Sequence, residues 1–141
     1  MIKNVYEILD EFEIAEGKAN KQKVLRENAS HHFLHVLRYT FDPKYQFHVK
    51  SFPKDYQEPD TFPGLRYAGI ESEIRRVYLF MKGDPTADKL SEEKRNQVLV
   101  QLLESFEPRE AHVFVNMMKK NLQTKFLTYN FVKETFPNLL P

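Results

Sequence analysis

The chain has 141 residues, no cysteine and a formal net charge of +1 at pH 7. This length suits one domain, residues 1–141, that buries its own core. Because cysteine is absent, neither a disulfide framework nor a zinc ribbon is possible. No apolar run approaches the roughly 20 residues of a membrane span, and the N-terminus lacks the basic-then-apolar order of a signal peptide. We therefore expect a soluble cytoplasmic protein that has no membrane partner.

The charge is distributed unevenly along the chain. A net charge of +1 argues against a generic nucleic-acid-binding domain, which is usually plainly basic. Segment 18–54 nevertheless holds eight Lys/Arg against two Asp/Glu, and segment 109–133 holds five against one. Segments 1–17 and 55–108 are acidic, each with a balance of −4. A protein with one basic face and acidic flanks would have this pattern.

Three helices are predicted in the N-terminal part of the chain. The first, over 4–15, has apolar residues at helical spacing. The second, over 20–27, is short and basic. Ser30 suits the cap of the third helix. This helix ends at Asp42, because the proline that follows disfavours helix in the residue before it.

Histidines in the third predicted helix raise the question of a metal site. His31 and His35 have the i, i+4 spacing that can share a cation, with His32 beside them. No acidic or cysteine partner lies in register, and polar positions on an amphipathic helix ordinarily face solvent. His35 equally suits a hydrogen bond within the core. We expect no metal here.

Polar and apolar residues alternate after the proline. Tyr45, Phe47 and Val49 are the apolar positions. The polar positions are Lys44, Gln46, His48 and Lys50. This alternation predicts either a short strand or an extended turn, with an aromatic edge toward the core and a basic edge outward.

The rest of the chain predicts one long loop and further helices. Loop 51–69 is rich in proline and too long for a mere connection in a compact domain, so we expect it to pack by its aromatics or to serve in binding. Helices are predicted over 70–82, 91–106, 108–122 and 128–136, with a brief helical segment at Pro85. The pattern as a whole predicts an all-α fold, a single compact domain of six or seven helices.

A helix that ends in YTFDP and leads into QFHVK, within residues 33–50, resembles a feature of a known family. It is similar to the N-terminal DNA-binding domain of phage-type ATP-dependent DNA ligases. Residues 5–10 and 20–25 resemble the first two helices of that domain. Residues 117–122 and 136–141 resemble its last two. The resemblance implies a DNA-ligase DNA-binding-domain-like fold, standing alone without the nucleotidyltransferase domain.

By this resemblance the protein binds double-stranded DNA along its minor-groove side and holds backbone phosphates, so that shape matters more than sequence. The residues implied in DNA binding are Lys44, His48, Lys50, Lys119, Lys120, Lys125 and Thr128. Lys119 and Lys120 equally suit the dipole of their own helix. Phe126 stands where the family usually has the glycine of a phosphate-binding Gly-x-Ser/Thr turn, and Asn121 replaces a common aspartate.

The sequence lacks the motifs of several catalytic sites. It has no Lys-x-Asp-Gly run for attack on ATP, no Walker loop and no Gly-x-Ser-x-Gly elbow. We therefore expect a non-catalytic protein, with no catalytic residues and no cofactor. A second hypothesis is a viral protein-interaction module that keeps the ligase-like fold and binds a replication or host protein in the host cytoplasm. The near-neutral charge and the altered turn favour this alternative.

Overall fold

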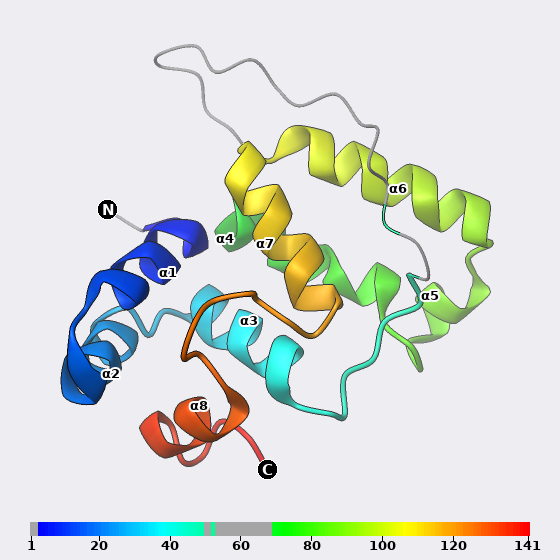
Figure 1. Cartoon of the computed structure of the whole chain (residues 1–141). Coiled ribbons are helices and arrows are strands. Elements are labelled where there is room, and N and C mark those ends of the chain that lie inside the picture. Colours follow the sequence, from blue (N-terminus) through cyan, green and yellow to red (C-terminus); the bar gives the residue numbers. More distant parts are fainter. Residues whose placement is uncertain (1–2, 50–51, 53–68) are drawn as a thin grey trace.

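The computed structural model describes residues 3–49, 52 and 69–141, which form eight α-helices, one 3₁₀ helix and no strand (Figure 1). The elements are α1 (Val5–Ile14), α2 (Gly17–Glu27), α3 (His31–Phe41), α4 (Ile70–Glu73), η1 (Ile74–Phe80), α5 (Pro85–Lys89), α6 (Glu92–Ser105), α7 (Pro108–Met118) and α8 (Tyr129–Thr135). The predicted all-α class is confirmed. Among the described helices, none has the length and apolarity that crossing a membrane requires.

The predicted helix over 70–82 is the main reason why the number of helices in the described structure differs from the number expected. It is divided into α4 and η1, and α5 forms separately from Pro85, so the described residues hold more helices than the six or seven expected. The Asp84 carboxylate accepts the backbone N–H groups of Thr86 and Ala87 at 2.9 and 3.1 Å, which caps α5. Proline at the first position of α5 has no N–H to satisfy, so it suits this start.

Other helix ends follow the signals in the sequence. Ser91 Oγ accepts the backbone N–H of Lys94 at 3.1 Å at the start of α6. Thr128 Oγ1 accepts that of Phe131 at 3.2 Å at the start of α8. Helix α3 ends immediately before Asp42, as predicted. Each side-chain cap contributes about 1 kcal/mol because it satisfies a donor that has no partner inside the helix.

The helices enclose one hydrophobic core, in which α7 contacts both α1 and α3. The Phe114 ring of α7 lies 5.4 Å from that of Phe106 and 6.3 Å from that of Phe80, between ring centroids. All three side chains are fully buried. Burying a side chain of this size contributes about 1.5–3 kcal/mol. Helix α7 is therefore the central element against which the N-terminal helices pack.

A buried carboxylate joins three of the helices. Glu110, in the first turn of α7, is fully buried and accepts the backbone N–H of Tyr6 at 2.9 Å and that of Ile70 at 3.1 Å. These donors belong to the N-terminal ends of α1 and α4, where the helix dipole favours negative charge. Burial raises the pKa of Glu110, although the backbone N–H groups of Tyr6, Ile70 and Val5 oppose that rise. A Cβ on Gly69 would lie 3.1 Å from Asn4 Oδ1, so a side chain at this junction would require the Asn4 side chain to shift by a few tenths of an ångström.

The segment after α3 is extended and makes one isolated antiparallel bridge, between Phe47 and Met81. The backbone N–H of His48 donates to the Phe80 carbonyl at 2.7 Å, and that of Lys82 donates to the Gln46 carbonyl at 2.8 Å. Of the two predicted possibilities, the extended turn is therefore the better description. Lys50 and nearly all of the predicted loop 51–69 lie outside the described residues.

Candidate nucleic-acid interface

The α7–α8 connection, residues 119–128, contains most of the predicted DNA-binding residues and begins with a left-handed turn. Helix α7 ends at Met118, earlier than the predicted end at Leu122. Lys120 has φ 65°, and its backbone N–H donates to the Met117 carbonyl at 3.0 Å. The N–H of Asn121 donates to the Asn116 carbonyl, also at 3.0 Å. This pair of hydrogen bonds is the Schellman motif, with lysine at the position that glycine usually occupies.

The Lys120 ammonium group caps a different helix from its own. Its Nζ donates to the backbone carbonyl of Tyr39, in the last turn of α3, at 2.5 Å. It also donates to the carbonyls of Asp42 at 2.8 Å and Tyr45 at 2.7 Å, which follow that helix. Burial lowers the pKa of Lys120, and the charge of Asp42 partly offsets this. An ammonium group has three N–H donors, so all the donors of Lys120 are engaged within the fold.

The other predicted lysines in the described residues are exposed. Lys44 lies over the ring of Tyr45, with Nζ 5.6 Å from the centroid, and Lys119 lies 5.0 Å over that of Phe52. Lys125 lies 5.3 Å from the centroid of the adjacent aromatic ring. A cation over an aromatic face is attracted to it, and solvent still reaches each of these ammonium groups. Their charges are therefore available to an anionic partner.

The end of the connection has phenylalanine where the resemblance to the ligase domain implies glycine. Phe126 has φ 70° and is 58% exposed. Such a positive φ is the conformation that glycine adopts without strain. Thr128 is exposed, and its hydroxyl caps α8. The connection therefore has a left-handed residue at Phe126, with a large aromatic side chain displayed to solvent.

His48 lies in a different environment, beside α5. Its Nε2 is 2.5 Å from Asp88 Oδ1, which also accepts the backbone N–H of Gly83 at 3.2 Å. The hydrogen bond from His48, and to a smaller extent the one from the Gly83 backbone, holds the pKa of Asp88 below its usual value. His48 is thus paired with a carboxylate, whereas the exposed lysines of the α7–α8 connection are not.

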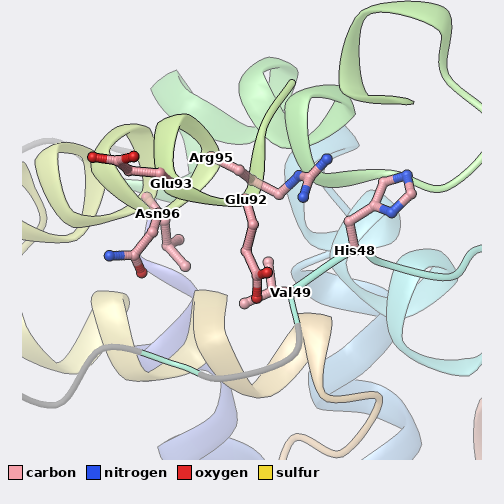
Figure 2. Close-up of a pocket in the computed structure, with 7 residues that line it drawn as sticks. His48, Val49, Glu92, Glu93, Arg95 and Asn96 are labelled. Carbon is pink, nitrogen blue, oxygen red and sulfur yellow. The ribbon is translucent and has the colours of Figure 1, made fainter. Parts of the chain in front are cut away.

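A cavity of about 210 Å³ adjoins His48 at the start of α6 (Figure 2). Arg95 lines it and is buried, with Nη2 donating to the carbonyls of Ala87 at 2.8 Å and Leu90 at 3.0 Å. Glu92 and Glu93 also line this cavity. Two carboxylates beside one guanidinium make the cavity a poor site for a phosphate, because the acids repel it.

The structure brings part of the predicted set together. Lys44 follows the C-terminal end of α3, and Lys119 precedes Lys120, whose ammonium group contacts that end of α3. Lys125 and Thr128 belong to the other end of the connection, where Thr128 caps α8. Lys50 lies outside the described residues. The sequence analysis missed Lys21 of α2, whose Nζ donates to the Phe12 carbonyl of α1 at 2.8 Å. The only signal for it was the basic composition of the second predicted helix.

Among known proteins, a family model matches residues 8–124, which is most of the chain. The chain belongs to the family of unknown function DUF6433. This DUF6433 chain is also similar in structure to a solved chain named Pmar-Lig_PreS3, a name that refers to a ligase. The TM-score is 0.69 and the sequence identity is 19%. The match covers 96% of this chain and 31% of that chain. At this identity the likeness shows the fold alone. No curated protein matches the DUF6433 chain in sequence.

Proposed function

We propose that this chain is a non-catalytic protein that binds duplex DNA through backbone phosphates with little sequence specificity. The observation that carries the proposal is the set of exposed cations Lys44, Lys119 and Lys125. None of the three has a carboxylate within ion-pair distance among the described residues. The fold likeness to a chain with a ligase-related title supports the same function. Phosphates would supply the missing counter-charges.

The proposed contacts carry no base information. Lysine binds a phosphate as a point charge, which positions a protein on a duplex without distinguishing its sequence. Thr128 stands at the start of α8 with an exposed side chain and suits a hydrogen bond to the same backbone. Lys120 contributes indirectly in this proposal, because it holds the end of α3 against the α7–α8 connection.

The absence of a Lys-x-Asp-Gly run supports a non-catalytic role. A lysine that attacks ATP must be deprotonated and close to the α-phosphate, and the proposed lysines are exposed on a surface. We place the protein in the cytoplasm, or in the host cytoplasm for a phage protein. No cofactor is part of this proposal.

The test is fluorescence anisotropy with labelled duplexes of unrelated sequence at low salt. The variant with Lys44, Lys119 and Lys125 all changed to alanine is expected to bind every duplex more weakly, by similar factors. The matched control changes Lys82, Lys89 and Lys94 to alanine. It removes the same charge from exposed lysines that also have no carboxylate partner, around α5 and α6. An equal loss of affinity in both variants would refute the proposed interface.

A specific observation favours a second candidate, binding to a replication or host protein. Ile14, at the end of α1, is 79% exposed. Together with the net charge of +1, this suits a partner surface that is partly apolar. A wild-type protein that binds no duplex even at low salt would favour this candidate, and a pull-down with Ile14→Lys as the comparison would then test it.

A further inference from the structure

Phe126 combines exposure with an unfavourable backbone conformation. Its φ of 70° is rare for a bulky residue, because the side chain crowds the backbone in the left-handed region. Its side chain is one of the few large apolar groups among the described residues that face solvent. Glycine would adopt the same turn without strain. The left-handed turn by itself therefore does not require an aromatic ring here.

The surroundings of the Phe126 ring are cationic. Lys125 Nζ lies 5.3 Å from the ring centroid, and Lys21 Nζ lies 5.4 Å from it. The position of Lys21 is fixed, since its ammonium group donates to the carbonyls of Phe12 and Glu13. An aromatic ring flanked by two ammonium groups suits a polyanion that also offers apolar surface. Stacked bases between two phosphate backbones have both properties.

We infer that Phe126 is a wedge that enters the minor groove of the bound duplex and inserts at a base step, while Lys125 contacts the adjacent phosphate. Apolar side chains inserted in this way unstack the step in part and bend the duplex. The inference rests on the proposed DNA binding and adds a contact to the bases themselves. It accounts for the exposure of the ring, the lysine beside it and a left-handed turn without glycine.

The absence of tryptophan from the chain allows a direct test. In Phe126→Trp the indole is the only tryptophan, and stacking on bases is expected to quench its emission when a duplex is added. The matched control is Tyr78→Trp, which places a single tryptophan at another exposed aromatic position, on η1. Its emission should not change at the same saturation, measured in parallel by anisotropy of the labelled duplex.

A second variant measures the energetic contribution of the ring. Phe126→Gly keeps the left-handed turn and is expected to bind duplex roughly five- to tenfold more weakly than wild type. The dependence of its affinity on salt should match that of wild type, because no charge is removed.

The outcomes separate the wedge from the proposed function. If wild type binds no duplex at low salt, the proposed function fails and the wedge fails with it. If wild type binds but Phe126→Trp is not quenched at saturation, only the wedge is overturned. Unchanged affinity of Phe126→Gly in a protein that binds DNA would overturn it equally. Quenching together with the loss of affinity supports it.

Discussion

Lys120 shows how the role of one residue depends on contacts far along the chain. A lysine near a helix end suits either its own helix dipole or a phosphate, and the sequence offers both. The structure instead directs its ammonium group to carbonyls 75 to 81 residues earlier, around the end of α3. Such a partner cannot be predicted from local spacing. By contrast, the caps Ser91 and Thr128 were predictable because each contacts a residue three positions later.

Changing Lys120 to alanine is expected to lower the free energy of unfolding by roughly 2–4 kcal/mol, because three partly buried carbonyls lose a charged donor. Urea denaturation measures this. Its neighbour provides the control, since Lys119 is exposed and Lys119→Ala should change stability by less than about 0.5 kcal/mol. Equal stability of the two variants would show that the Lys120 hydrogen bonds contribute little.

Glu110 predicts a pH dependence of stability at the residue scale. Burial raises its pKa in the folded protein above the ordinary value of a glutamate, so the folded state holds the proton more tightly than the unfolded state does. The resulting contribution is present below the unfolded pKa and is lost as pH rises through the folded pKa. Glu110→Gln removes this titration. The unfolding free energy of wild type minus that of the variant should fall across this window, and a difference independent of pH would contradict the assignment.

At the scale of elements, the α7–α8 connection was the least predictable part of the described chain. The spacing of apolar residues predicted that α7 would extend to Leu122, because the apolar side chain of Leu122 continues that spacing. The left-handed conformation of Lys120 ends the helix first, and Leu122 is buried from the connection instead. Likewise, the apolar spacing over 70–82 indicated one helix but did not reveal the change to 3₁₀ geometry at Ile74. The sequence located helical faces better than helix ends.

The strain at Phe126 gives an element-scale prediction that is independent of DNA. In Phe126→Gly, relief of the left-handed strain offsets the greater freedom of glycine in the unfolded chain, so stability should stay within about 1 kcal/mol of wild type. The neighbouring residue Leu127 is buried, and Leu127→Ala should cost about 2–4 kcal/mol. Thermal denaturation compares the two variants. A large loss in Phe126→Gly would mean that the ring supports the fold after all.

At the scale of the whole molecule, composition alone gave an ambiguous answer about nucleic acid. The net charge of +1 is nearly neutral, yet the described structure leaves Lys44, Lys119 and Lys125 without acidic partners around α3 and α7. The acids of α1 are partly engaged elsewhere, as where Arg109 pairs with Asp10 at 2.7 Å. Segregation of charge along the chain was therefore the useful signal, whereas the lack of acidic partners for these lysines among the described residues required the fold.

The number of phosphates that the protein neutralises can be measured from salt dependence. With three free lysines, log K against log salt should have a slope of about −2.7, at about −0.9 for each phosphate. Changing Lys119 and Lys125 to alanine should reduce the slope by roughly two units. Titrations at several salt concentrations provide the values. A slope that the two substitutions leave unchanged would exclude these lysines from the contact.

Glu110, in the first turn of α7, and Lys120, just after its end, bind residues far earlier in the chain. Glu110 accepts a hydrogen bond from Tyr6, and Lys120 donates one to Tyr39. As the polypeptide leaves the ribosome, α1 and α3 emerge long before the residues that fix them. Until α7 has been translated, the apolar faces of α1 and α3 therefore lack their contacts with α7. A nascent chain stalled before α7 is a natural client for chaperones, and one that includes residue 120 can make the contacts of α7 with α1 and α3, while the core still awaits Leu122, Leu127 and Val132.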